Sequence, residues 1–383
     1  MMVWLSEHGY DCTVLTSYPY YPQWEIQPPY IHKSYRYTVE MHGKIKVYRC
    51  PLYVPAKPSG SRRMLMEMTF STSALVRILR FLVKEKFDTV ITVVPPFHLG
   101  MLALMYRKIF KSKVIYHIQD LQIEAAKELK MIKNEHLLKL LFKIEKYILR
   151  RADVVSSISS AMIERIELKS LRKVLFFPNW ADTNVIFPLH NQDDLKAEFG
   201  FAATDKIILY SGAIGEKQGL SIVLDAALAL KDNTAVKFII CGSGPYKIIL
   251  QDTASQLGLE NVFFFPLQPV EKMNHFLNMA YLHLVIQKAD ASDLVMPSKL
   301  ANILAVGGLV LVTANEDSVL HTDINAHNMG LLVPAENKDA LIAGIEKAIH
   351  TDCTCLKENA RKYAENFLSI DKVLQTFVKD AVE

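Results

Sequence analysis

The feature that most constrains the fold is the alternation of short β-branched and aromatic runs with longer helical patterns along nearly the whole chain. Runs of the first kind are typical of strands. They are CTVLTS (12–17), IKVYRC (45–50), TVITVV (89–94), KVIYHI (113–118), DVVSSIS (153–159), KVLFFP (173–178), KIILYSG (206–212), VKFIICG (236–242), VFFFP (262–266), LHLVIQ (282–287) and LVLVTA (309–314). Helical patterns lie between them, for example at 64–86, 134–151, 219–231, 245–257, 271–278, 298–305 and 338–349. Apolar strands interleaved with helices indicate an α/β fold, with parallel sheets covered on both faces.

The pattern divides near PNWADTNVIFP (178–188), which has two prolines and no clear periodicity. A length of 383 residues also suits two domains better than one. Right-handed crossovers make each half a doubly wound, Rossmann-like domain. We therefore expect residues 1–180 and 181–355 to form two such domains that face a ligand cleft. We expect residues 356–383 to form a long amphipathic helix that packs back toward the first domain.

The amino terminus departs from this pattern. A doubly wound domain opens with a strand, but MMVWLSEHG already has the pattern of the first helix, ended by Gly9, and CTVLTS would be the second strand. The first strand lies in the middle of such a sheet, so its absence predicts a hole beside buried neighbours. We expect a start assigned downstream of the true one; a damaged domain is the alternative.

Several classes of protein are excluded by simple counts. The five cysteines are odd in number and scattered, which argues against a disulfide framework, and the CxC at Cys353 and Cys355 lacks a second pair at zinc-site spacing. A reducing cytoplasm fits this usage best. MMVWLSEHGY lacks the apolar core of a signal peptide. The uncharged run 89–106 is about long enough to cross a membrane, but Pro95-Pro96 predicts strand, turn and helix instead.

Charge is distributed unevenly along the chain. Residues 1–180 carry 28 Lys and Arg against 15 Asp and Glu, whereas residues 181–383 carry 16 against 25. This asymmetry suggests that the two halves meet different partners, with drift in surface composition as the alternative. The segment 57–86 has seven basic and two acidic residues interleaved with apolar ones. It fits either a face that lies on an anionic membrane or a core helix with a solvated basic face. No nucleic-acid-binding motif accompanies the charge.

Two glycine-bearing loops follow strands of the second half. AIGEKQGL (213–220) places Gly215 and Lys217 where backbone N–H groups and a cation could meet a phosphate. CGSGP (241–245) is a tight turn whose Gly242 and Gly244 would bring main chain close to a flat ligand such as a base. Each loop is weak evidence alone, because glycine turns at strand ends are common.

A third loop, in DLVMPSKLANILAVGG (293–308), leads into a helix. Pro297 suits a first helical turn, and Ser298 and Lys299 then lie where free N–H groups and the positive dipole end project. Gly307 ends the predicted helix. Three such loops in one domain favour a nucleotide diphosphate as ligand. None of them is a P-loop, so ATP hydrolysis is not supported.

In the first half, YHIQDL (116–121) ends a strand with two polar residues. His117 could donate to a sugar hydroxyl, and Asp120 could act as an acceptor or base. The alternative is a histidine whose hydrogen bonds are satisfied at a strand end.

Together, FFPNWAD, YSGAIGEKQGL, CGSGP and DLVMPSKLANILAVGG resemble the donor-binding half of glycosyltransferase family 4, with the GT-B fold. PYYPQW (19–24) and YHIQDLQIEAAKELKMIK (116–133) are similar to the branch that includes the WcaI and WbuB type transferases of bacterial colanic acid and O-antigen assembly. The resemblance covers nearly the whole chain.

The resemblance implies a retaining transfer from a UDP- or GDP-type nucleotide sugar, without a metal or other cofactor. It implies a saccharide on a polyprenyl diphosphate as acceptor, and a cytoplasmic enzyme that associates peripherally with the inner face of the plasma membrane. The first domain would then meet the acceptor and an anionic membrane, and the second the donor. Gly215, Lys217, Ser298 and Lys299 match the positions that stabilise the leaving diphosphate, and His117 matches a histidine beside the sugar.

Two departures from the family pattern stand out. The family has two glutamates eight positions apart; Asn302 stands at the second, which holds the ribose, and Leu294 near the first, beside Asp293 as a substitute catalytic acid. Asn302 can bond a ribose hydroxyl, but without charge assistance. The family's diphosphate Arg and Lys match Ala213 and Gln218, which leaves Lys217 shifted by one.

These departures keep alternatives to catalysis open. One is a non-catalytic GT-B protein that binds a nucleotide sugar or acts as a scaffold. A nucleotide-sugar 2-epimerase on the same fold fits less well, because the basic segment 57–86 would have no role.

Overall fold

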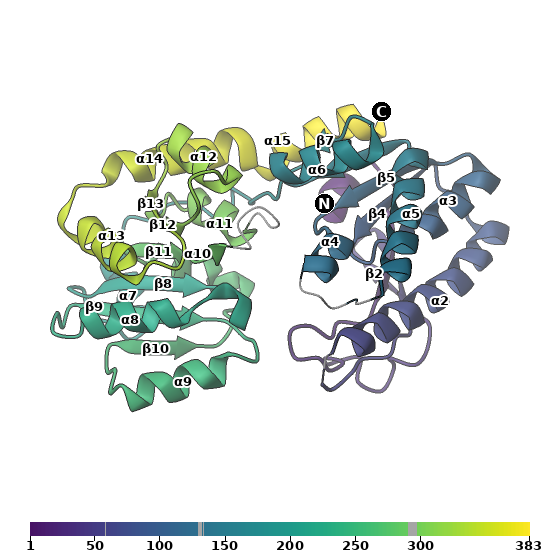
Figure 1. The fold of residues 1–383 in the computed structure, drawn as a ribbon. Coiled ribbons are helices and arrows are strands. Elements are labelled where there is room, and N and C mark those ends of the chain that lie inside the picture. The colour runs from purple at the N-terminus through teal and green to yellow at the C-terminus, as the bar shows by residue number, and fades with distance from the viewer. Residues whose placement is uncertain (58, 129–131, 133, 290–296) are drawn as a thin grey trace. The chain divides into compact units, whose positions relative to one another are not determined.

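The computed structural model describes the chain except for residue 58, residues 129–131, residue 133 and residues 290–296 (Figure 1). The described residues divide into two compact units. Unit 1 consists of Met1–Phe177 with Leu374–Glu383, and unit 2 of Pro178–Val373. Each unit contains a parallel sheet and helices, and unit 1 has a second, mixed sheet, so the expected α/β class is confirmed.

Unit 2 contains a parallel six-stranded sheet in its described part, in the order β10-β9-β8-β11-β12-β13. The strands are β8 (Lys206–Ser211), β9 (Val236–Cys241), β10 (Val262–Phe265), β11 (Leu282–Val285), β12 (Val310–Thr313) and β13 (Leu331–Val333). Successive side chains face opposite sides: Ile208 belongs to one apolar core and Leu209 to the other. Both faces of the sheet are therefore buried, as the continuous apolar runs predicted.

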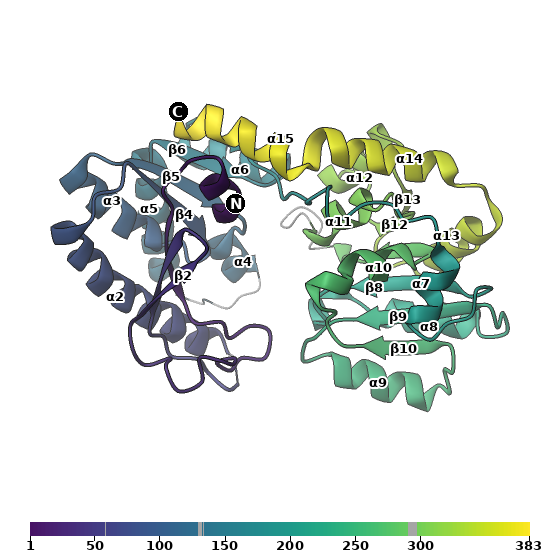
Figure 2. The same ribbon diagram turned by 180° about the vertical axis from the view of Figure 1, so that it is seen from behind.

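Helices cover both faces of that sheet (Figures 1 and 2). Helices α8 (Ser221–Ala229), α9 (Lys247–Gln256) and α13 (Lys338–His350) contribute to the core that contains Ile208. Helices α10 (Met273–Asn278), α11 (Lys299–Ala305) and α14 (Thr354–Tyr363) contribute to the core that contains Leu209. The remaining helices of the unit are α7 (Gln192–Glu198) and α12 (Val319–Ala326).

Unit 1 contains two separate sheets in the described part of the chain. One has the order β1-β3-β2, with β1 (Thr13–Ser17), β2 (Thr38–His42) and β3 (Ile45–Cys50). The other is parallel, in the order β4-β5-β6-β7, with β4 (Thr89–Val94), β5 (Lys113–Ile118), β6 (Val154–Ser157) and β7 (Leu175–Phe176). The predicted hole is present: a cavity of about 620 Å³ lies between β1 and β4.

The helices of unit 1 are α1 (Met2–Glu7), α2 (Gly60–Lys84), α3 (Leu99–Phe110), α4 (Gln122–Glu128), α5 (Glu135–Arg151) and α6 (Ser160–Ser170). The uncharged run 89–106 forms β4 and most of α3, as Pro95-Pro96 predicted. Within the described residues, no helix combines the length and apolar character that a membrane span needs.

The carboxyl-terminal segment differs from the single helix expected over 356–383. After α14 comes a π-helical turn (Ala364–Leu368); Ser369 is then extended, and α15 (Ile370–Phe377) and a last π turn follow. Ser369 leaves the helical path because it pairs with Ala181: the Ala181 N–H donates to Leu368 O at 2.8 Å, and the Ile370 N–H donates to Ala181 O at 2.9 Å. The prediction of an unbroken helix was therefore wrong.

Candidate functional site

The loops after β8 and β9 form one backbone layer at the carboxyl edge of the unit 2 sheet. The Gly212 N–H donates to Cys241 O at 2.9 Å, and the Ile214 N–H donates to Ser243 O at 2.9 Å. The Tyr246 N–H in turn donates to Ile214 O at 3.2 Å. The strand ladder thus continues past the ends of both strands and holds the two loops together.

Both glycines of the β9 loop are required by this layer. Gly242 and Gly244 have φ of +149° and +152°. A Cβ on Gly242 would lie 1.9 Å from Gly212 O, and one on Gly244 would lie 2.1 Å from Ile214 O. The sequence predicted these glycines as a close approach of main chain to a base. In the structure they allow a close approach of main chain to main chain, and their contact with a nucleoside stays a prediction.

Lys299, the first residue of α11, places its ammonium beneath the β8 loop. Its Nζ lies 3.7 Å from the centroid of the Tyr210 ring and 3.2 Å from Leu284 O, to which it donates. A Cβ on Gly212 would lie 3.8 Å from the same nitrogen. The ammonium therefore lies between the ends of β8 and β11, beside the glycine loop.

The electrostatics of this lysine are unusual. Burial lowers the pKa of Lys299 to about 7. The Tyr210 ring and one carbonyl face the ammonium, and no ion pair of Lys299 is found among the described residues. A buried cation without an ion-pair partner in the described part of the chain is the kind of group that an anionic ligand would stabilise.

In the β8 loop, the backbone N–H of Gly215 is already hydrogen-bonded to a side chain. The Gly215 N–H donates to Gln218 Oε1 at 3.1 Å, across the 3-10 turn Glu216–Gln218. An incoming phosphate would have to displace that side-chain amide to reach the Gly215 N–H. Lys217 lies within the turn, but its side chain is outside the part of the chain that the structure describes.

The remaining predicted donor residues lie at α11. Ser298 is exposed and precedes Lys299 as the N-cap, and Asn302 is partly exposed one turn later. Three-residue spacing places Asn302 on the side of the helix that carries Lys299, away from the buried Leu300. Asp293 and its neighbour Leu294 lie outside the described residues.

In unit 1, His117 lies near the carboxyl end of β5 and is buried. Its Nδ1 is 3.0 Å from Ser156 Oγ on β6, and its ring packs against Phe177, which stacks on Phe377 of α15 at 3.9 Å. Burial lowers the pKa of His117 to about 4, so the imidazole is neutral near pH 7. Its buried Nε2 has no hydrogen-bond partner among the described residues, which suits a ligand hydroxyl.

Asp120 follows β5 and is partly buried. It belongs to the same strand end as His117, as the sequence predicted. Nothing in the structure tests whether either residue acts in catalysis.

A half-buried carboxyl group at the same edge of unit 1 was missed from the sequence. Glu67 of α2 accepts hydrogen bonds from Gln122 Nε2 at 2.8 and 2.9 Å, and Gln122 Oε1 accepts from the Phe97 N–H at 3.1 Å. Burial raises the pKa of the Glu67 carboxyl, which the hydrogen bond from Gln122 partly offsets. The available signal was a lone glutamate among apolar residues on α2.

Within the described ranges, no three His, Cys, Asp or Glu side chains are grouped as a metal ion would require.

Comparison with known proteins adds two family matches. Residues 1–180 match the family described as "Glycosyl transferase 4-like domain", and residues 191–367 match "Glycosyl transferases group 1". The chain is 36% identical to the "Putative colanic acid biosynthesis glycosyl transferase WcaI" of Escherichia coli strain K12, over 99% of this chain and 94% of that protein. It is 23% identical to the "O-antigen chain mannosyltransferase C" of Escherichia coli, over 81% of this chain and 78% of that protein.

Two solved structures share the architecture. Sucrose-phosphate synthase from Thermosynechococcus elongatus matches with a TM-score of 0.75 and 16% identity, over 98% of this chain and 89% of that one. HepE of Anabaena, in complex with UDP-glucose, matches with a TM-score of 0.69 and 14% identity, over 97% and 99% of the two chains. At these identities the likeness shows a common fold.

Proposed function

Because this chain belongs to the glycosyltransferases of the GT-B fold, as its sequence motifs predicted, we propose that it moves a sugar from a nucleotide-diphosphate sugar to a glycan acceptor. The transfer would retain the configuration of the donor sugar. The acceptor class is a saccharide on a polyprenyl diphosphate, in the assembly of an exopolysaccharide or O-antigen. The names of the two Escherichia coli relatives support the polysaccharide context.

The observation that carries the proposal is the buried ammonium of Lys299, which lies beside the β8 glycine loop and has no ion pair with any residue that the structure describes. Breaking the bond between a sugar and a nucleoside diphosphate leaves negative charge on the departing oxygen. A fixed cation in a water-poor site stabilises that charge without reorganisation. The complex of HepE with UDP-glucose supports a ligand of this class on this fold.

Unit 1 would then orient the sugar and the acceptor. His117 is neutral, so its imidazole can exchange a hydrogen bond with a sugar hydroxyl through Nε2 without a charge. Glu67, Gln122 and the Phe97 N–H form a linked set at the same edge, able to orient an acceptor hydroxyl. We propose no metal in this reaction, because Lys299 supplies the positive charge that a metal would bring.

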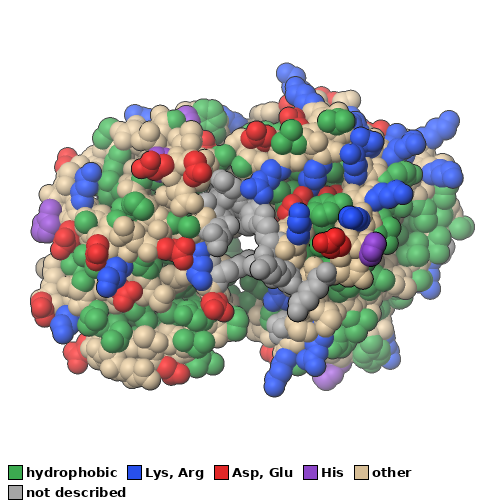
Figure 3. Space-filling view, viewed as in Figure 1, with side chains coloured by type: hydrophobic (Ala, Val, Ile, Leu, Met, Phe, Trp, Pro, Cys, Tyr) green, Lys and Arg blue, Asp and Glu red, His purple; other side chains and the backbone are tan. Residues whose placement is uncertain are grey.

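A lipid-linked acceptor brings the enzyme to a membrane, and α2 supports this part of the proposal. Its outer face presents apolar side chains at two places, with three- or four-residue spacing within each, and each is more than a third exposed: Leu65 and Met68, then Val76, Leu79 and Val83. The exposed Arg62 and Arg63 lie at the start of the same helix. On unit 1, hydrophobic and basic side chains gather on the face shown in Figure 3. Such a helix binds an anionic surface by burying its apolar side chains there and by the attraction of its arginines to the anionic lipids.

The test is incubation of the purified protein with UDP-, GDP- and dTDP-sugars and a lipid-linked acceptor. We expect nucleotide release and a glycolipid product for one donor, with the anomeric configuration of the donor preserved. Lys299→Ala should lower turnover at least ten-fold, whereas Lys231→Ala, which removes an exposed lysine of unit 2, should not.

Two results would contradict the proposal. Absence of product with every donor would favour the non-catalytic alternative, provided that binding of a nucleotide sugar is still detected. Full activity of Lys299→Ala would remove that lysine from the site even if transfer occurs.

A further inference from the structure

A second lysine lies at the carboxyl edge of the unit 2 sheet, and the donor site described so far does not include it. Lys288 follows β11 and is partly buried. In the sheet, β11 lies between β8 and β12. The segment after β11 can therefore contact the loops that follow both of these neighbours.

The backbone on both sides of Lys288 is fixed by groups that follow β11's neighbours in the sheet. The Gln287 N–H donates to Thr313 Oγ1 at 2.8 Å, and Thr313 Oγ1 donates to Gln287 O at 3.0 Å. On the other side, the Ala289 N–H donates to Glu336 Oε2 at 3.1 Å. The Lys288 side chain therefore projects from an anchored segment of backbone.

That side chain lies along Gly219, the last residue of the β8 loop. A Cβ on Gly219 would lie 3.1 Å from Lys288 Cγ and 3.6 Å from Lys288 Cε. Gly219 also has φ of +68°. Glycine is therefore required there both by the backbone conformation and by the close approach of the lysine. The ammonium is bonded directly to Cε, so it is held near this end of the loop.

Lys299 and Lys288 thus lie at opposite ends of one loop. A Cβ on Gly212, the first residue of the loop, would lie 3.8 Å from Lys299 Nζ, whereas the Lys288 side chain lies against Gly219. With the residues that the structure describes, Lys288 forms no hydrogen bond or ion pair. Two cations without acidic partners in the described chain therefore border the same glycine loop.

We propose that Lys288 is a second cation of the donor site, and that with Lys299 it makes the site selective for a nucleoside diphosphate over a nucleoside monophosphate. This inference rests on the proposed function, because it adds a residue to the same donor site. A monophosphate carries its charge on one phosphate group, which a single cation can oppose. A diphosphate carries charge on two groups and can meet a cation at each end of the loop.

The competing explanation is that Lys288 only packs its methylene groups against Gly219 and leaves its ammonium in water. Lysine side chains often cover surface in this way. The anchored backbone and the shared loop with Lys299 favour the binding role. Charge and packing can also be separated by substitution, since methionine keeps the unbranched side chain and arginine keeps the charge.

The test is calorimetric titration of the full chain with UMP, UDP, GMP and GDP. In Lys288→Met, affinity for the nucleoside diphosphate that the wild type binds should fall about ten-fold, because one charge-assisted contact is lost. Affinity for the corresponding monophosphate should change by less than about three-fold. Lys288→Arg should keep most of the diphosphate affinity, and the thermal midpoint of each variant checks folding.

The matched control is Lys231→Met, which removes an exposed lysine just after α8 and should change neither affinity. Unchanged diphosphate affinity in Lys288→Met would overturn the role of Lys288 and leave the proposed function intact. Equal losses for monophosphate and diphosphate would also overturn it, as would a loss in Lys288→Arg as large as in Lys288→Met. Failure of the wild type to bind any of the four nucleotides would instead contradict the proposed function itself.

Discussion

Lys299 is the residue whose environment says most about function. A lysine ammonium prefers water, but here it contacts the Tyr210 ring, donates to Leu284 O and lies close to Gly212. Burial lowers its pKa to about 7, so the folded protein tends to release this proton near neutral pH. The unfolded chain keeps the ordinary value of 10.5 and binds more protons between these two values. The lysine therefore weakens the ligand-free fold most where it is charged.

This leads to a prediction with opposite signs for stability and binding. The free energy of unfolding of the ligand-free protein should rise as pH increases from about 7 toward 10.5, because the unfolded state binds more protons there. UDP affinity should fall as pH rises through about 7, since the diphosphate needs the ammonium. Denaturant unfolding and calorimetric titration across this range measure the two quantities.

The matched control for this prediction is Lys299→Met, which keeps an unbranched apolar side chain in the same space. In this variant, the free energy of unfolding and the UDP affinity should lose the part of their pH dependence that Lys299 contributes. Any pH dependence of UDP affinity that remains comes from titration of the nucleotide or of other groups. If UDP affinity of the wild type rises with pH over the same interval, Lys299 does not bind the diphosphate.

Gly242 and Gly244 show which part of a loop structure a sequence motif predicts and which part it does not. The pattern at Gly242 and Gly244 correctly indicated a tight turn after a strand. It did not reveal that the space left by the missing side chains is filled by Gly212 O and Ile214 O of another loop. That neighbour is distant in sequence, so only the folded chain shows it.

At the scale of elements, α2 has two apolar faces. One face packs into the core of unit 1 and contains the buried Met66, Ala74 and Phe81. The other face is exposed and contains Leu79 and Val83. The sequence left a membrane face and a core helix as alternatives, and the structure shows a helix that has a core face and an outer apolar face. Arg77 is not part of the outer surface charge, because its guanidinium packs over the rings of Tyr37 and Tyr48.

The membrane part of the proposal can be tested on that outer face. Leu79→Asp places a charge in the middle of the exposed stripe and should lower binding to vesicles with anionic lipid by about ten-fold. Leu168→Asp is the matched control, since Leu168 of α6 is also highly exposed on unit 1. Co-sedimentation with anionic and neutral vesicles measures the effect. Equal loss in both variants would assign it to general surface charge.

Strong elements were predicted from the chain with bounds close to the observed ones, because their apolar patterns are long and regular. Two strands were missed. β2, TVEMH, has a charged residue at its centre and pairs antiparallel at a sheet edge. β13 has three residues, too few for a periodic signal. The break at Ser369 was missed because its cause, pairing with Ala181, is a contact distant in sequence.

For the whole molecule, the charge difference between the halves corresponds closely to the two compact units. Unit 2 holds the described loops assigned to the donor. Unit 1 holds His117, Glu67 and the basic, apolar outer face of α2. The last ten residues belong to unit 1 although they follow unit 2 in the chain, and Phe377 stacks there on Phe177.

This division predicts where a nucleotide will act. Saturating UDP should slow amide exchange in unit 2, at residues 212–220, 242–246 and 299–305, and leave the β5 and β6 amides of unit 1 unchanged. The expected slowing is about ten-fold or more at a hundred-fold excess over the dissociation constant. Hydrogen exchange read by mass spectrometry on the full chain measures it. Protection confined to unit 1 would reverse the proposed roles of the two units.

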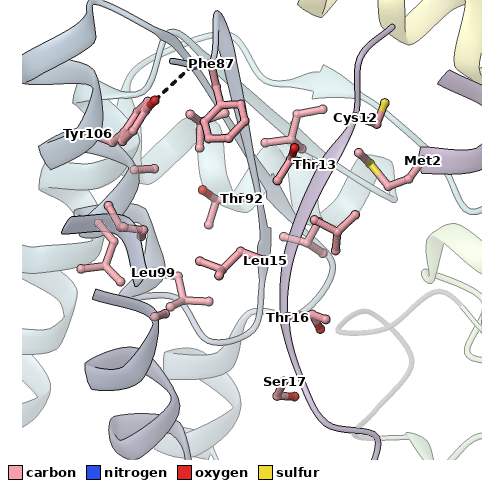
Figure 4. A pocket seen from close by; sticks show the side chains of 18 of the residues that line it. Met2, Cys12, Thr13, Leu15, Thr16, Ser17, Phe87, Thr92, Leu99 and Tyr106 are labelled. Atoms are coloured by element: carbon pink, nitrogen blue, oxygen red, sulfur yellow. Dashed lines mark hydrogen bonds between the residues drawn. The ribbon is translucent and has the colours of Figure 1, made fainter. Parts of the chain in front are cut away.

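The α/β class, the division into two units and the three strand-end loops follow from the chain alone, because local periodicity and turn chemistry are written in neighbouring residues. The hole beside β1 (Figure 4) was also predictable, since a doubly wound sheet has a required strand order. Only the folded structure shows the burial of the Lys299 ammonium, the loop layer behind Gly242 and Gly244, and the Glu67–Gln122 pair. Each depends on groups far apart in sequence, whose meeting is set by packing.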